Sequence, residues 1–189
     1  MTLKISRRVL LSGLAAAFSL GIAFSGVPAA AAPAAGSCTL VDQMHRTVKL
    51  PARVNRIVVL QHHSLDILAE LGATDRVVGV MQKWDNLLDS SFADIMPRIK
   101  TLPEPGSLKS ASVEQVAALK PDLVVVSNQM PRETVDRLTA LGIPVMAITL
   151  YVADKEQAST IHPSLVNPDA AYTEGLKQAI ELLARATGT

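Results

Sequence analysis

The chain has 189 residues, of which 49% are hydrophobic and 19% charged, so it has enough apolar residues for one globular core and is not expected to be disordered. Aromatic residues make up only 3%, which argues against a carbohydrate or nucleic-acid site built on stacked rings. The net charge is +1, and it becomes −2 without the first 35 residues, which hold three cations and no acid; a body of this charge shows no electrostatic footprint for nucleic acid.

The first 35 residues have the layout of a secretory leader. A short basic tip is followed by an apolar run over residues 9–24 and then by a stretch rich in Ala and Pro. We expect a signal peptide over residues 1–35, because an apolar run of about 16 residues is shorter than the roughly 20 that span a bilayer. The pair Arg7-Arg8 also resembles a twin-arginine signal, and both that route and the general secretory route stay open. The mature protein is therefore expected in the periplasm.

The only cysteine, Cys38, comes directly after this leader. A single thiol excludes an internal disulfide and a multi-thiolate metal site. The small residues before it, Ala35-Gly36-Ser37, fit a lipoprotein signal, but the aliphatic residue expected three positions before the cysteine is missing. A lipid anchor at Cys38 stays open, and a lone thiol near the mature N-terminus is the favoured interpretation.

The body alternates short apolar strands with helices. A hairpin is expected over residues 39–50, and four apolar, mostly β-branched runs predict buried strands at residues 56–60, 76–80, 123–127 and 145–149. Helices are predicted between them, with Ser64 as the cap of the first, and with Val135, Leu138 and Leu141 facing inward in the one before the fourth strand. This alternation favours an α/β fold with a Rossmann-like parallel sheet and helices on both of its faces.

The last part of the chain begins with an irregular polar stretch and ends in a long helix. Asn167 is expected to cap this helix and Pro168 to open it. An apolar stripe at helical spacing contains Tyr172, Leu176, Ala179, Ile180 and Leu183. A helix about 30 Å long with such a stripe normally covers a further element, so we expect the C-terminal part of the stripe to lack cover.

Several of these segments resemble the N-terminal lobe of the periplasmic substrate-binding proteins that serve ABC importers of iron–siderophores, haem and cobalamin. The blocks that carry the resemblance are residues 41–51 with 56–60, residues 65–80, residues 113–125, which include Ala-Leu-Lys-Pro-Asp-Leu, and residues 142–145. The final helix resembles the start of the spine helix that joins the two lobes of that family. The second lobe is absent, so the chain looks truncated.

The resemblance implies a domain plan and a function. It divides the chain into the leader (1–35), a substrate-binding lobe (36–150), and an irregular segment with the start of the spine helix (151–189). It implies an exported solute-binding component of an ABC importer, which is not an enzyme and needs no cofactor. The implied partners are a small-molecule metal chelate, such as an iron–siderophore or cobalamin, and a permease in the membrane.

Two alternatives to a metal-chelate receptor stay open. One is an exported metal-dependent enzyme or chelatase-like domain that uses His62 and His63, although the motifs of hydrolases, phosphate-loop proteins and zinc proteases do not occur in the sequence. The other is a binding protein of the same family for an oxyanion such as molybdate. The sequence does not decide between these ligands.

Ligands of open parallel sheets bind beyond the carboxyl ends of the strands. His62 and His63 follow the first sheet strand and are expected to meet the ligand, although a hydrogen bond within their loop is the simpler role for one of them. Trp84, the only tryptophan, follows the second strand and either stacks on a flat ligand or covers the sheet edge. Gln129 follows the third strand and either lines the pocket or caps the following helix. Tyr151 ends the fourth strand, where its ring and hydroxyl suit a wet cleft, and packing at the rim is an equal alternative. These five residues form the predicted ligand site, and whether it holds a metal stays open.

Three neighbouring positions have simpler explanations. Asn128 is expected to cap the following helix, although a role in the pocket is nearly as well supported. Lys83 is expected to be solvated. The Gly106-Ser107 pair is expected to form a plain turn, although its backbone N–H groups have the character of an anion-binding loop.

Overall fold

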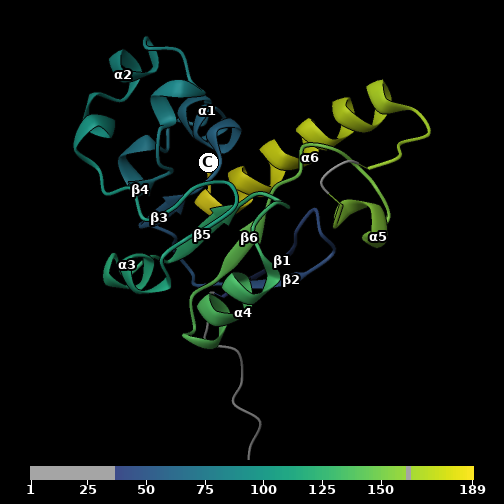
Figure 1. Cartoon of the computed structure of the whole chain (residues 1–189), viewed down its shortest axis with the longest axis horizontal. Coiled ribbons are helices and arrows are strands. Elements are labelled where there is room, and N and C mark those ends of the chain that lie inside the picture. Colours follow the sequence, from purple (N-terminus) through teal and green to yellow (C-terminus); the bar gives the residue numbers. More distant parts are fainter. Residues whose placement is uncertain (1–36, 161–162) are drawn as a thin grey trace, which may run out of the picture. The chain divides into compact units, whose positions relative to one another are not determined.

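The computed structural model describes residues 37–160 and 163–189 (Figure 1). The expected signal peptide and its twin-arginine pair therefore lie outside the described residues. Near the start of the described part, β1 (Cys38–Val41) and β2 (Thr47–Leu50) form the predicted antiparallel hairpin. Within the described ranges, no helix combines the length and the hydropathy that crossing a membrane requires.

A four-stranded parallel sheet forms the centre of the body. Its strands are β3 (Ile57–Val59), β4 (Val77–Val80), β5 (Leu123–Val126) and β6 (Val145–Ala147). They lie in the order β4-β3-β5-β6, and every neighbouring pair is parallel. Successive strand residues point to opposite faces, so Val58 and Val124 pack in one core cluster and Val59 and Val125 in the other. The predicted α/β parallel sheet is confirmed.

Helices cover both faces of this sheet (Figure 1). The helices are α1 (His62–Glu70), α2 (Phe92–Ile95), α3 (Val113–Ala118), α4 (Arg132–Ala140), α5 (Lys155–Ala158) and α6 (Pro168–Thr187). Side chains of α1, α2 and α6 belong to one core cluster, and side chains of α3 and α4 belong to the other. Apolar burial on both faces explains why the strand sequences are continuous apolar runs and not alternating ones.

Two local predictions in these helices are wrong. Ser64 does not cap α1, because it lies inside the helix and its hydroxyl donates to Oε1 of Gln61 at 2.6 Å. Gln61 precedes the helix instead, and its amide nitrogen donates to the carbonyl of Ile148 at 2.9 Å, which fixes the start of α1 against the end of β6. Leu141 does not face inward either; it follows the last residue of α4 and is 59% exposed.

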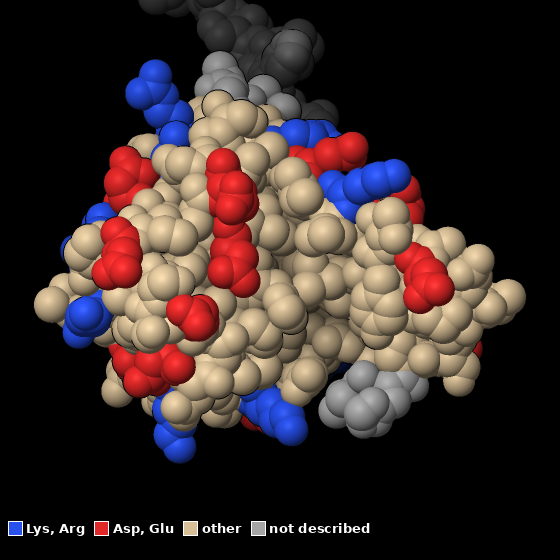
Figure 2. All heavy atoms as spheres, turned by 90° about the horizontal axis from the view of Figure 1, so that it is seen from above, with Lys and Arg blue, Asp and Glu red and all other residues tan. Residues whose placement is uncertain are grey.

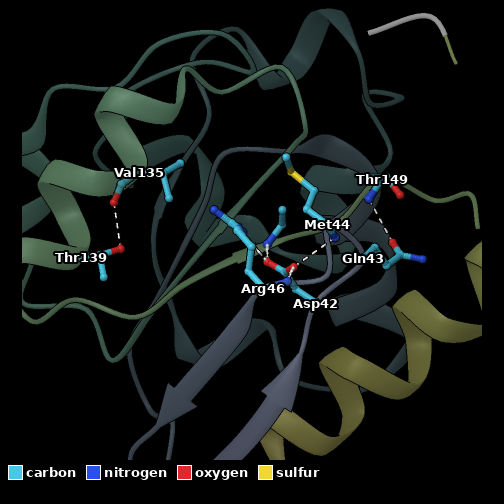
Figure 3. A network of polar contacts seen from close by, with 8 residues as sticks. Asp42, Gln43, Met44, Arg46, Val135, Thr139 and Thr149 are labelled. Atoms are coloured by element: carbon cyan, nitrogen blue, oxygen red, sulfur yellow. Dashed lines mark hydrogen bonds and ion pairs between the residues drawn. The ribbon is translucent and has the colours of Figure 1, made fainter. Parts of the chain in front are cut away.

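The hairpin turn covers the free edge of β6 with two buried polar side chains (Figure 3). Oδ2 of Asp42 accepts a hydrogen bond from the amide of Ala147 at 3.0 Å and pairs with Arg46 at 2.7 Å. Oε1 of Gln43 accepts the amides of residues 149 and 150, at 2.9 and 3.1 Å. An uncovered strand edge is a template for aggregation. Here the side chains of Asp42 and Gln43 bind the free backbone amides at this edge, so the chain covers the edge itself.

The long helix α6 begins as predicted, with Asn167 accepting the amide of Ala170 at 3.2 Å and Pro168 in the first position. Its C-terminal half is buried against the core through Ala179, Leu182, Leu183 and Ala186. The exposed part of the stripe is a row along one side, Tyr172, Leu176 and Ile180, at 49%, 46% and 40%. The expectation that the C-terminal part lacks cover is therefore wrong, because that part packs on the same core cluster as α1.

Candidate functional site

A hollow of about 490 Å³ lies at the carboxyl ends of β3, β5 and β6. We call it the strand-end hollow; its lining consists of residues 61–63, 127–129 and 149–151 together with Leu108, Tyr172 and Leu176. The sheet order reverses between β3 and β5, since the chain extends the sheet to β4 on one side and to β6 on the other. Such a switch point is where open α/β sheets bind their ligands.

In the part of the chain that the structure describes, the lining of the strand-end hollow holds no Asp, Glu, Lys or Arg. Its polar groups are imidazoles, side-chain amides and hydroxyls, all of which are neutral or can donate hydrogen bonds. Figure 2 shows one face of the molecule, on which an uncharged depression lies between raised parts that carry carboxylates. A site of this kind can accept a small anion without repulsion from a carboxylate.

His62 and His63 are the first two residues of α1, where the helix begins at the hollow. The residue before them, Gln61, makes no side-chain cap, so the first N–H groups of the helix receive no cap from it. These groups and the helix dipole together attract negative charge. The predicted placement of both histidines at the end of the first sheet strand is therefore confirmed, but they belong to a helix N-terminus and not to a loop.

The two imidazoles lie close together, with ring centroids 3.9 Å apart and planes tilted by 41°. His63 is exposed, whereas His62 is partly buried, and its Nδ1 is buried without a hydrogen-bond partner among the described residues. Burial, and then the neighbouring His63, lower the pKa of His62 below its ordinary value. The His62 ring is therefore neutral at neutral pH and keeps one N–H to donate.

Tyr151 lines the hollow with its ring, while its hydroxyl is used within the protein. The hydroxyl donates to the carbonyl of Thr160 at 3.1 Å and accepts from Nδ2 of Asn128 at 3.0 Å. Burial raises the pKa of Tyr151, so the phenol stays neutral. The Asn128 amide also donates to Thr160, and α4 follows Pro131, so the prediction that Asn128 caps this helix is wrong. Asn128 holds the segment after β6 instead.

Gln129 also lines the strand-end hollow. Its backbone amide donates to the hydroxyl of Ser127 at 3.1 Å, and that hydroxyl donates to the carbonyl of Leu108 at 3.1 Å. These bonds fix the end of β5, from which the Gln129 side chain extends. The structure therefore brings together His62, His63, Gln129 and Tyr151, which come from three different strand ends.

Trp84 lies apart from these four residues. Its side chain is 8% exposed, belongs to the core cluster that includes α1, and does not line the strand-end hollow. The 3₁₀ turn Trp84–Asn86 follows a left-handed residue, Lys83 (φ 55°), and the indole packs in the core beyond this bend. Of the two roles that the sequence left open, the structure places Trp84 in packing. The amide of Ser107 donates to the carbonyl of Ser110 at 2.6 Å, so this N–H is used within the loop.

Sequence reasoning did not assign Tyr172 and Leu176 to the site, although both line the hollow from α6. The ring of Tyr172 meets that of Tyr151 edge to face, with centroids 5.8 Å apart. Their spacing on the apolar stripe gave a signal, but the signal predicted packing and not a ligand contact. In the described ranges, no three side chains of His, Cys, Asp or Glu gather closely enough to hold a metal ion.

The sequence profile of the periplasmic binding protein family matches residues 57–189. The molybdate-binding protein MolA of Haemophilus influenzae is 39% identical over 145 residues, which are 77% of this chain and 41% of that protein. A cobalamin-binding protein of Halobacterium salinarum is 32% identical over 106 residues, which are 55% of this chain and 26% of that protein. This chain thus spans less than half the length of these relatives.

Solved structures show the same fold. The structure of MolA from Haemophilus influenzae with bound molybdate superposes with a TM-score of 0.77 at 38% identity, covering 80% of this chain and 46% of that chain. The petrobactin-binding protein YclQ of Bacillus subtilis superposes with a TM-score of 0.55 at 22% identity, covering 80% of this chain and 45% of that chain. At the lower identity the match speaks for the fold alone.

Proposed function

This chain belongs to the periplasmic binding protein family, and from that membership we propose that it captures a small oxyanion of the molybdate type and delivers it to an ABC permease. The observation that carries the proposal is the start of α1 at the strand-end hollow. There, N–H groups without a side-chain cap and the two imidazoles of His62 and His63 meet at a surface without carboxylates. An oxyanion offers only acceptor oxygens, so it is the ligand class that these donors fit.

The similarity to the molybdate-binding protein supports the oxyanion over the metal chelate that the sequence favoured. That relative is 39% identical, and its structure holds molybdate. Cobalamin is the second candidate, because a cobalamin-binding relative matches 106 residues of this chain at 32% identity. A corrin is far larger than an oxyanion and would need apolar contacts, of which the hollow offers Leu108, Leu150 and Leu176.

Calorimetry of the mature chain against molybdate, sulfate, phosphate and cyanocobalamin tests this proposal. We expect heat of binding with molybdate, and an affinity about 10-fold or more lower in the double variant His62→Gln/His63→Gln, because a hydrogen bond to a charged group contributes about 1.5–3 kcal/mol. The matched control is His45→Gln, a histidine of the hairpin turn outside the hollow. Binding of cyanocobalamin without molybdate binding would reverse the choice of ligand.

A further inference from the structure

A second cavity, of about 330 Å³, lies at the end of the sheet opposite the strand-end hollow. Residues 53–55 lie just before β3, with Arg56 between them and the strand, and Arg76 directly precedes β4. The cavity is therefore at the amino ends of these strands, and the last residues of α6 close it. Among the described residues, three arginines line it, Arg53, Arg76 and Arg185, and no Asp or Glu does. We call it the arginine pocket.

Arg76 is fixed in this pocket by the protein itself. Its guanidinium donates to the carbonyl of Val54 at 3.3 Å and to that of Thr187 at the end of α6. These bonds cap the helix end, and they give Arg76 a structural role of its own. They also leave further N–H groups of a rigid, partly buried guanidinium beside the cavity.

Arg53 and Arg185 lack the structural hydrogen bonds that fix Arg76 among the described residues. Both are exposed, and within the described residues neither they nor Arg76 form an ion pair with a carboxylate. Glu181 lies one turn before Arg185 on α6 but does not pair with it. The C-terminal end of α6 contributes a dipole equivalent to about half a negative charge, which is small against three guanidinium charges. The described lining of the pocket therefore carries three positive side chains and no acidic one.

We propose that the arginine pocket binds a phosphate group, carried either by an anionic phospholipid headgroup or by inorganic phosphate. Guanidinium groups match phosphate oxygens through paired N–H donors, and three of them around one cavity can contact one phosphate from several sides. Cys38 also lines the pocket, and it follows the expected leader by three residues. A lipid anchor at Cys38, which the sequence leaves open, would hold the pocket at the membrane headgroups, and this favours the lipid as the source.

The test uses two phosphate sources. The full chain is floated with vesicles of phosphatidylglycerol and phosphatidylcholine, or of phosphatidylcholine alone, and is titrated separately with inorganic phosphate. We expect binding to the anionic vesicles, reduced at least 10-fold in Arg53→Gln/Arg185→Gln; Arg76 stays unchanged because its bonds hold the end of α6. Binding to phosphate alone, lost in the same variant, supports the pocket with the free anion as its source.

Two control variants make the result decisive. Arg132→Gln/Arg137→Gln on α4 removes the same charge elsewhere and should leave binding unchanged. His62→Gln/His63→Gln should leave vesicle binding unchanged, and phosphate binding is assigned to the arginine pocket only where Arg53→Gln/Arg185→Gln loses it and this histidine variant keeps it. The proposal is overturned if neither source binds, or if the α4 variant loses as much affinity as the pocket variant. Circular dichroism of each variant confirms that the comparison is between folded proteins.

Discussion

Gly175 of α6 lies against the backbone of Tyr151 so closely that a Cβ at residue 175 would be 2.2 Å from the Tyr151 Cα. No side chain fits at this crossing, and the carbonyl of Gly175 accepts a hydrogen bond from Nε2 of Gln43 at 2.7 Å. One turn earlier, Tyr172 meets the ring of Tyr151. The close approach of α6 to the segment after β6 therefore sets one wall of the strand-end hollow.

Gly175→Ala is expected to destabilise the protein by about 1–2 kcal/mol. Alanine in a helix normally adds up to about 1 kcal/mol over glycine, but the backbone of Tyr151 must move, and overpacking of this kind costs about 1–3 kcal/mol. The shift should also widen the hollow and weaken oxyanion binding. Urea denaturation measures the first effect and calorimetry the second. Thr173→Ala, an exposed change on the same helix, should stay within about 0.5 kcal/mol. A stability gain in Gly175→Ala would contradict the close crossing.

Gln43 joins three parts of the body through one buried side chain. Its Oε1 accepts hydrogen bonds from the backbone amides of Thr149 and Leu150, and its Nε2 donates a hydrogen bond to the carbonyl of Gly175. Gln43→Ala leaves these groups without their partner, and each buried unsatisfied group costs about 1–3 kcal/mol, so we expect a loss of about 3 kcal/mol or more in the free energy of unfolding. Urea denaturation provides the measurement, with Thr47→Ala on the exposed face of the hairpin as control. A loss below about 1 kcal/mol would mean that water replaces these bonds.

Local sequence signals predicted the strands and several helix ends. The continuous apolar run at residues 123–126 predicts a strand buried on both faces. Gly72 and Gly142 end α1 and α4 with positive φ values of 66° and 77°. The burial of Asp42 and Gln43 could not be predicted in this way. Their partners are more than 100 positions away in the sequence, and a polar turn looks the same whether it faces water or a strand edge.

The candidate site was predictable to a similar extent. The rule that ligands bind at the carboxyl ends of parallel strands selects His62, His63, Gln129 and Tyr151, and the structure brings them together. The same rule also selected Trp84, because it follows a strand, but the direction of its ring depends on the 3₁₀ turn and on the core that receives it. The position in the sequence shows that a residue lies at the carboxyl ends of the strands. It does not show whether the ring of that residue points into the hollow or into the core.

His62 is expected to make stability depend on pH. Burial and His63 lower its pKa in the folded state below the ordinary value of 6.5, so the folded protein binds fewer protons than the unfolded chain. The contribution to stability is therefore complete above about pH 6.5, and it is lost as the pH falls from there toward the lowered pKa. His62→Gln should flatten this part of the curve in urea denaturation at several pH values. An unchanged slope would show that the His62 ring is not desolvated.

Oxyanion binding should have the opposite pH dependence. A protonated His62 attracts an anion more strongly than a neutral ring does, so the affinity for molybdate should increase as the pH is lowered while the protein stays folded. Calorimetry at neutral pH and at several pH values below about 6.5, where a lowered pKa places the protonation of His62, measures this, and His62→Gln should reduce the increase. Affinity that is independent of pH in the wild-type chain would mean that the ligand contacts only backbone N–H groups or other side chains.

Removal of the Tyr151 hydroxyl distinguishes a structural role of this group from a direct contact with the ligand. Because this hydroxyl already donates to Thr160 and accepts from Asn128, Tyr151→Phe should leave molybdate affinity nearly unchanged and should destabilise the protein by about 1 kcal/mol. Residues 152–160 should then exchange their amide hydrogens faster, since they lose a bond that holds them to the strand ends. Hydrogen exchange measured by mass spectrometry, together with calorimetry, tests both statements. A 10-fold loss of affinity with unchanged exchange would show that the hydroxyl turns to the ligand when molybdate binds.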